Sequence, residues 1–372
     1  MTGAAAELTA ALVTIDSVNP ALVPGGAGEA EIAAYVAGWL RKAGLDVETH
    51  DAAPGRPNVV GTVRGTGDGP SLMLNAHMDT VGVDGMARPL EPVIRDGRLH
   101  GRGAYDMKGS LAACMLAAAR LAAAPPAGDV LLAAVADEEH ASLGTQALLR
   151  RQRTDHAIVT EPTGLRLCVA HKGFAWAEIE TAGRAAHGSR PDEGVDAIAR
   201  MAPVLQRLAA LQAELPGRPA HPLLGAPSVH ASVIEGGQEM SSYPARCRLG
   251  IERRTLPGET AQAVARECEA LIDGAAGATV TMGLVREPFE AALDGPLIEA
   301  VDRAAKPITG GPPERYGDTF WMDAALIGAA GIPTVVFGPA GAGAHAAEEW
   351  VDLASVEACA RVLETTAREL HR

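Results

Sequence analysis

The sequence predicts an α/β protein in which a mostly parallel sheet, covered by helices, carries an inserted ferredoxin-like α+β domain. With 372 residues, the chain exceeds the ~250 to 300 at which single cores stop growing, so we expect two domains. Apolar strands alternate with helices up to about residue 170 and again near the end, which is typical of a parallel sheet covered on both faces. Between these stretches the expected order is β-α-β-β-α-β, that of a ferredoxin-like unit.

The first stretch, residues 1–172, alternates helices with strands. Apolar residues spaced as on one helix face predict helices over 28–45, ending near Gly44, and 107–124. Short apolar runs bounded by turn residues predict strands over 47–52, 58–65, 71–77, 129–139 and 157–163.

The inserted domain is expected over 173–288. The segment GFAWAEIETAG alternates apolar and polar residues like a half-exposed strand. The remaining elements are a helix (195–215), two strands (227–237 and 245–256), a second helix (260–275) and a last strand (278–291).

The final stretch, 289–372, returns to the pattern of the first. Helices are expected over 297–305, 319–331 and 351–371, with a buried strand over 332–339. Because this strand resembles those of the first stretch, we expect it to join the same sheet. Residues 1–172 and 289–372 therefore form one predicted domain.

Composition excludes several classes of partner. Hydrophobic residues make up 47% and charged residues 21%, which is ordinary for a soluble globular protein. The net charge of −14 disfavours nucleic acids and anionic lipid surfaces. No apolar run approaches the ~20 residues of a membrane span.

Cysteine usage and the amino terminus indicate a reducing compartment. The five cysteines are far apart and form no C-x-x-C pair, which argues against a disulfide framework or a cysteine-based zinc site. The opening MTGAAAELTAALVTIDS has no basic segment leading into an apolar one. We therefore expect no signal peptide and a cytoplasmic protein.

Polar residues follow four of the predicted strands. His77 ends the strand SLMLNAH, Glu138 and Glu139 end DVLLAAVADEE, Glu161 follows AIVT, and His345 comes just after TVVFGP. The carboxyl edge of an open α/β sheet is where ligands bind. Two adjacent carboxylates repel each other unless a positive charge or a shared proton lies between them.

Each of these residues also has a simpler interpretation. Asp79 and Glu161 are common turn residues, His345 is a loop histidine, and Asp106, before a helix, is a typical N-cap. Together, however, they form a set of imidazole and carboxylate groups at one sheet edge. That set suits zinc or a similar divalent ion.

An ordered series of motifs resembles a known family. The motifs are H-x-D at 77–79, G-R-G-x-x-D-M-K-G at 101–109, D-E-E at 137–139, T-E-P-T at 160–163, A-H-G-S at 186–189, R-T-L-P-G-E at 254–259 and G-x-H-x-x-x-E at 343–349. The chain resembles the zinc-dependent acetylornithine deacetylase, succinyl-diaminopimelate desuccinylase and glutamate carboxypeptidase family. The resemblance covers nearly the whole chain, including the inserted domain.

The resemblance implies a site with two divalent ions, most often zinc, with cobalt or manganese as alternatives. His77, Asp106 and Glu161 would hold one ion, and Asp106, Glu139 and His345 the other, with Asp106 bridging. Asp79 would orient His77 through its carboxylate. Glu138 would be the catalytic base.

The resemblance also gives roles to the inserted domain, as a lid and as the interface of a homodimer. His187 would stabilise the oxyanion, reaching the metals by domain closure or from the partner subunit. Arg254 would bind a substrate carboxylate, because a guanidinium matches that group bidentately. Without the family, His187 reads as an exposed turn residue and Arg254 as a surface pair with Glu252 or Glu259.

Two positions depart from the family pattern and leave substrate specificity open. Many relatives have asparagine three residues before the proline of N-x-x-P, where this chain has Ser241. Many have threonine or serine before D-A, where this chain has Met322.

The expected function is cleavage of the amide of an N-acyl amino acid by an enzyme similar to acetylornithine deacetylase. The alternative within hydrolases is a glutamate carboxypeptidase-like or dipeptidase-like enzyme with a dipeptide substrate. A non-catalytic metal- or peptide-binding relative would be expected to lack Glu138 or a ligand. The glycine-rich segments do not spell G-x-G-x-x-G opening a helix, and no G-x-S-x-G occurs, so oxidoreductases and serine hydrolases are disfavoured.

Overall fold

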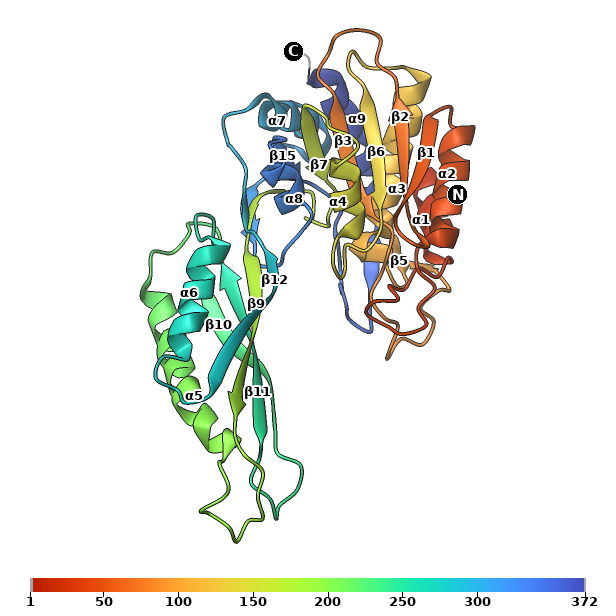
Figure 1. The fold of residues 1–372 in the computed structure, drawn as a ribbon. Helices are drawn as coiled ribbons and strands as arrows, with labels where there is room; N and C mark the ends of the chain where they lie inside the picture. The colour runs from red at the N-terminus through yellow and green to blue at the C-terminus, as the bar shows by residue number, and fades with distance from the viewer. Residues whose placement is uncertain (1–2, 371–372) are drawn as a thin grey trace. The chain divides into compact units, whose positions relative to one another are not determined.

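The computed structural model describes residues 3–370 and divides into two compact units (Figure 1). The first unit comprises Met1–Val169, Ala291–Tyr316 and Met322–Arg372, and the second comprises Ala170–Glu290 and Gly317–Trp321. No helix among the described residues is long and apolar enough to cross a membrane.

Helices occupy both units. They are α1 (Ala4–Val13), α2 (Ala30–Lys42), α3 (Gly109–Ala123), α4 (Leu143–Leu149), α5 (Ala197–Glu214), α6 (Ala261–Leu271), α7 (Pro296–Thr309), α8 (Ala324–Ala329) and α9 (Leu353–Glu369), with short helical turns η1 (Ala104–Lys108) and η2 (Leu215–Gly217). The helix expected over 319–331 forms only at α8. For the last helix, the prediction at residue 371 lies outside the described residues.

Strands form three sheets. They are β1 (Asp46–Ala53), β2 (Arg56–Val63), β3 (Leu72–His77), β4 (Val93–Arg95), β5 (Arg98–His100), β6 (Val130–Val135), β7 (His156–Val159), β8 (Leu167–His171), β9 (Gly173–Ala182), β10 (Ser228–Gly236), β11 (Arg246–Thr255), β12 (Ala278–Arg286), β13 (Phe289–Glu290), β14 (Arg315–Asp318), β15 (Thr334–Val336), β16 (Gly341–Ala342) and β17 (Trp350–Asp352).

The largest sheet, of nine strands within residues 3–370, has the order β1-β2-β6-β3-β7-β15-β8-β13, with β14 beside β8. Its centre, β6-β3-β7-β15, is parallel, as predicted. The prediction of a mostly parallel sheet is wrong at the margins, where β1, β2, β8 and β13 pair antiparallel. At one margin the reason is local, because only Pro54 and Gly55 join β1 to β2, and so short a loop permits only a hairpin.

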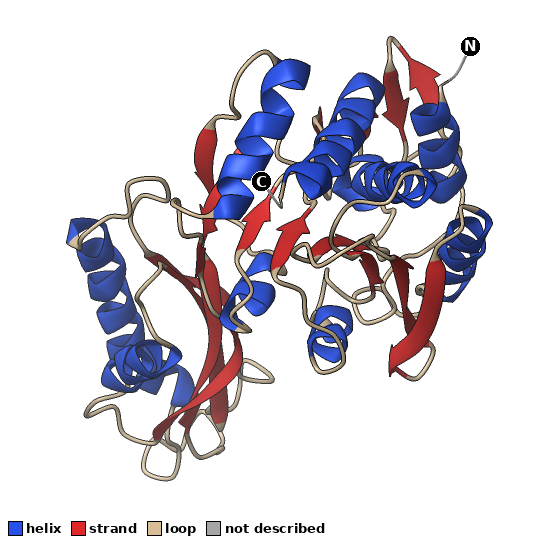
Figure 2. Ribbon diagram, turned by 90° about the horizontal axis from the view of Figure 1, so that it is seen from above, coloured by secondary structure: helices blue, strands red, loops and turns tan. Residues whose placement is uncertain are grey.

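Helices cover this sheet on both faces (Figures 1 and 2). Side chains of α1, α2, α3, α7 and α9 share one large buried cluster with the sheet. The shorter helices α4 and α8 contact each other and the strands from the opposite face. Alanine, leucine and valine supply most of this core, in keeping with an aromatic content of 3%. The central strands are therefore buried on both faces, which explains their uninterrupted apolar sequence.

A small sheet, β16-β17-β5-β4, is absent from the sequence-based prediction. Its hairpin β4–β5 turns at Asp96 and Gly97, which have φ of 49° and 76°. Positive φ at both positions is the mark of a type I′ turn, for which Asp-Gly is a preferred sequence. This sheet joins the segment before Asp106 to the segment after His345.

The second unit has the element order β9, α5, β10, β11, α6, β12 around an antiparallel sheet ordered β10-β11-β9-β12. Helices α5 and α6 lie on one face of that sheet (Figure 2). Both helices have side-chain N-caps, Asp196 accepting from the amide of Ala199 and Thr260 from that of Ala263.

Candidate metal centre

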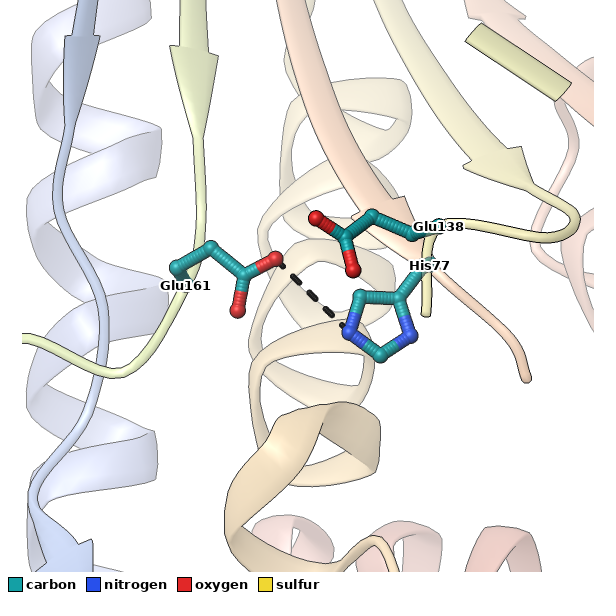
Figure 3. Close-up of side chains that lie close together, drawn as sticks. All are labelled: His77, Glu138 and Glu161. Carbon is teal, nitrogen blue, oxygen red and sulfur yellow. Dashed lines mark ion pairs between the residues drawn. The ribbon is translucent and has the colours of Figure 1, made fainter. Parts of the chain in front are cut away.

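The parallel centre of the large sheet brings the predicted residues to one edge. His77 is the last residue of β3, Glu138 and Glu139 follow β6, and Glu161 follows β7. Because β6, β3 and β7 are neighbours and parallel, their carboxyl ends meet at the same edge. Figure 3 shows His77, Glu138 and Glu161 converging from these three strand ends.

Asp106 lies between the two histidines and does not cap α3. Its Oδ1 is 3.1 Å from Nε2 of His77, and its Oδ2 is 3.4 Å from Nε2 of His345. No side chain caps α3, whose N-cap residue is Lys108. The simpler N-cap interpretation of Asp106 is therefore wrong.

Each histidine has a further carboxylate beside it. Nε2 of His77 is 3.7 Å from Oε1 of Glu161, and Nε2 of His345 is 2.9 Å from Oε2 of Glu139. Candidate ligand atoms of His77, Glu138 and Glu161 lie within 4.8 Å of one another, as do those of His77, Asp106 and Glu139. The two groups of nitrogen and oxygen atoms share His77, and Asp106 connects His77 to His345.

The electrostatics of the site are those of crowded anions. Burial and the charge of Glu161 raise the pKa of Glu138 well above its ordinary value, and burial also raises the pKa of Glu161. Burial acts to lower the pKa of His77, but the surrounding carboxylates outweigh it and raise that pKa. Hydrogen bonds that His345 donates to the carboxylates of Asp106 and Glu139 raise its pKa to about 10.

The residues present fit a divalent cation. Among the described residues, the buried Oε1 of Glu139 has no hydrogen-bond partner, and a buried carboxylate oxygen is costly to leave unpaired. A cation would supply the missing partner and offset the repulsion among the carboxylates. Imidazole nitrogen with carboxylate oxygen is a donor set typical of zinc and related ions.

Asp79 differs from the sequence-based prediction in the atoms it uses. The backbone oxygen of Asp79 is 2.9 Å from Nδ1 of His77, whereas its carboxylate Oδ1 is 3.7 Å away. The carboxylate instead accepts hydrogen bonds from the amides of Glu138 (3.1 Å) and Glu139 (3.2 Å). Asp79 therefore holds the turn that carries the two glutamates, and its main chain faces His77.

Glu349 is a structural residue of the site that the sequence analysis missed. Its buried carboxylate accepts hydrogen bonds from the amides of Gly103, Tyr105 and Asp106, and from Nη1 of Arg102 at 2.6 Å. These bonds fix the loop that presents Asp106. The available signal was the final glutamate of the G-x-H-x-x-x-E motif.

His187 and Arg254 belong to the second unit. His187 is exposed in a turn, with Nδ1 2.8 Å from Oγ of Ser189. Nε of Arg254 donates to Oε1 of Glu252 at 2.6 Å, and the guanidinium lies 5.4 Å from the ring centre of Phe174. Their catalytic and binding roles stay predictions.

Comparison with known proteins identifies the family. The sequence profile of peptidase family M20/M25/M40 matches residues 73–369. The acetylornithine deacetylase of Myxococcus xanthus is 33% identical over 355 residues, covering 88% of this chain and 89% of that protein.

Solved structures share the fold. A tripeptidase from Staphylococcus aureus superposes with a TM-score of 0.83 at 20% identity, covering all of both chains. A dinuclear metal-binding peptidase of the M20 family from Bacillus subtilis gives a TM-score of 0.74 at 16% identity, over 99% of this chain and 97% of that one. The chain therefore belongs to peptidase family M20/M25/M40, and it is a hydrolytic enzyme that acts on amide bonds.

Proposed function

We propose that this protein is a deacylase that hydrolyses the amide bond of an N-acyl amino acid at a dinuclear metal centre. The observation that carries the proposal is the joining of two histidine and carboxylate groups by Asp106, with Glu138 beside them. The likeness to acetylornithine deacetylase over most of the chain supports the choice of substrate class.

In this proposal, His77, Asp106 and Glu161 hold one ion, and Asp106, Glu139 and His345 hold the other. Zinc ions held there, or cobalt or manganese in their place, would supply Lewis-acid chemistry that makes water more acidic and polarises the substrate carbonyl. The carboxylate of Glu138 accepts a proton from the attacking water and delivers it to the departing amine. Burial, together with the charge of Glu161, raises the pKa of Glu138 and so favours the step in which Glu138 takes up the proton.

Elemental analysis and a substrate panel test the function. We expect purified protein to contain close to a pair of divalent ions per chain and to hydrolyse N-acetyl amino acids, with N-acetylornithine tried first. Dipeptides belong in the same panel, since the glutamate carboxypeptidase and dipeptidase alternative also cleaves an amide beside a free carboxylate. Turnover of dipeptides but not of N-acyl amino acids would replace the proposed function with that alternative.

The second unit supplies the remaining groups of the proposed enzyme. We take it as the inserted ferredoxin-like domain, acting as a lid and as the interface of a homodimer. His187 would donate to the oxyanion of the tetrahedral intermediate from the partner subunit. Its side chain is exposed and contacts Oγ of Ser189 through Nδ1, which suits a group available to a second chain.

Mixed dimers test whether His187 acts in trans. Two inactive variants, His187→Ala and Glu138→Gln, are co-expressed with different tags, and the doubly tagged dimer is isolated. If His187 acts across subunits, one site of that dimer is complete, so activity recovers to about half of the wild-type value per dimer. An inactive mixed dimer would show that His187 acts within its own chain, and a fully active His187→Ala homodimer would remove its catalytic role.

Arg254 is proposed to bind the free carboxylate of the substrate. A guanidinium offers two parallel donors to a carboxylate. Glu252, its present partner, lies on the same strand and is only partly exposed. We expect Glu252 to keep the guanidinium oriented, since Trp176 also donates to that carboxylate at 2.9 Å.

Replacing Arg254 by alanine should raise KM for the free-acid substrate by about 10- to 100-fold, because a charge-assisted hydrogen bond contributes about 1.5 to 3 kcal/mol. The methyl ester of the same substrate should lose far less. Arg246→Ala is the matched control, since Arg246 lies on the same strand and also pairs with a glutamate, Glu180. An equal rise in KM for the free acid and for its methyl ester would show that Arg254 does not bind the substrate carboxylate.

A further inference from the structure

A buried group of charges lies behind the turn that carries Glu138 and Glu139. We name it the Arg56 cluster, and it consists of Glu29, Arg56 and Asp137. Glu29 precedes α2, Arg56 begins β2, and Asp137 follows β6. The side chains of Glu29 and Asp137 are fully buried, and that of Arg56 is 11% exposed.

The guanidinium of Arg56 connects the two carboxylates. It donates to both oxygens of Glu29, with Nη2 2.6 Å from Oε1, and Nη2 is also 3.0 Å from Oδ1 of Asp137. Glu29 in turn accepts a hydrogen bond from the amide of Asp137 at 3.1 Å. Asp137 is thus fixed through its side chain and its main chain.

Asn19 extends these contacts to the candidate metal centre. Its Nδ2 donates to Asp137 Oδ1 at 3.0 Å and to Asp79 Oδ2 at 2.7 Å. The carboxylate of Asp79 accepts hydrogen bonds from the backbone amides of Glu138 and Glu139. A continuous series of hydrogen bonds therefore joins Arg56 to the backbone of the proposed base and of a proposed ligand, although Arg56 touches neither.

The turn needs this support for two physical reasons. Asp137 has φ of 67°, in the left-handed region that residues with a side chain seldom adopt, so its surroundings must hold it there. Two buried carboxylates that share one side of the turn would also repel each other without a cation between them. A guanidinium meets both needs, because its planar fork offers donors to two acceptors at once.

We propose that Arg56 is a positioning residue, which fixes Asp137 and thereby aims Glu138 and Glu139 at the reacting atoms. The roles of those two glutamates rest on the proposed function. Residues that hold ligands and catalytic groups in place typically affect metal affinity or activity by about 10- to 100-fold when changed. A purely structural Arg56 would instead change the amount of folded protein and leave each folded molecule fully active.

Two variants separate these roles. Arg56→Gln removes the charge, and Arg56→Lys keeps it but replaces the fork by a single ammonium group, which protects the test if the glutamine variant fails to fold. Arg64→Gln is the matched control. Arg64 also pairs with two carboxylates, Asp46 and Asp129, but at an exposed position just beyond β2.

Two readouts are taken from folded, metal-loaded protein. The first is kcat and KM for the substrate found in the panel, per mole of bound metal. The second is hydrogen–deuterium exchange over residues 136–144, which needs no activity. For Arg56→Lys we expect kcat to fall by about tenfold with KM within about twofold, together with faster exchange in 136–144. Arg64→Gln should match the wild type in both.

The outcomes are distinguishable from failure of the proposed function. Unchanged kcat and unchanged exchange in Arg56→Lys would overturn the positioning role while leaving the deacylase intact. If the wild-type enzyme hydrolyses no amide in the panel, the proposed deacylase function is wrong. Faster exchange over residues 136–144 in Arg56→Lys would in that case still support the role of Arg56 in fixing the turn. A variant with normal exchange and normal kcat but a lower melting temperature would show Arg56 to be structural only.

Discussion

The Glu138→Gln variant is expected to lose turnover by about 10³-fold while keeping both metal sites occupied. A glutamine has the shape of the glutamate but cannot accept and return a proton, and general base catalysis contributes about 10²- to 10⁴-fold. The carboxyl group of Glu138 also lies close to His77 and Glu161. The variant therefore tests whether Glu138 acts as the catalytic base or as a metal ligand.

The measurement pairs kcat with metal content, and Glu139→Gln is made in parallel. Oε2 of Glu139 is 2.9 Å from His345, so this second variant should lose one ion along with activity. Glu91→Gln, at an exposed glutamate of the same unit, is the control and should match the wild type. If Glu138→Gln loses metal and Glu139→Gln keeps it, the two roles must be exchanged.

The site residues at the carboxyl ends of the parallel strands could be predicted, because their positions follow from short-range sequence patterns. A buried parallel strand is an apolar run, and a polar residue where that run stops must lie at a sheet edge. His77, Glu138 and Glu161 follow that rule. Asp106 does not, because it comes from a loop before a helix, where aspartate most often caps. Only its position between two histidines, which is a tertiary property, removes that interpretation.

The residues that hold the site could not be predicted in the same way. Arg56 and Asp137 are 81 positions apart, and Arg102 and Glu349 are 247 apart. Arg102, Asp137 and Glu349 lie within the quoted motifs, but nothing in those motifs indicates which charged residue each of them pairs with. Their pairing arises only when the sheet forms, and burial then makes the pairing obligatory. The antiparallel margins were missed for a related reason, since an apolar strand has the same pattern in either direction.

Replacing Asp106 by asparagine should have the second large effect, because it acts on both groups of the candidate centre. Hydrogen bonds from His77 and His345 outweigh burial and hold the pKa of Asp106 below its ordinary value, so it is anionic. Asparagine keeps the shape but cannot bridge cations with two charged oxygens. We expect fewer than a pair of ions per chain and at least about a 10³-fold loss of kcat, the equivalent of several kcal/mol of charge stabilisation.

The metal-free variant gives an independent readout of the same geometry. With no metal bound, Asp106 and Glu139 stabilise the imidazolium form of His345 in the wild type and raise its pKa to about 10. Removing one of these anions must lower that pKa, and Glu139 should keep it above the ordinary value near 6.5. Titration of the histidine signals by NMR measures the change, with the exposed Asp84→Asn variant as control. An Asp106→Asn protein that keeps its metal content, and whose metal-free form keeps the raised pKa of His345, would show that Asp106 does not join the two groups.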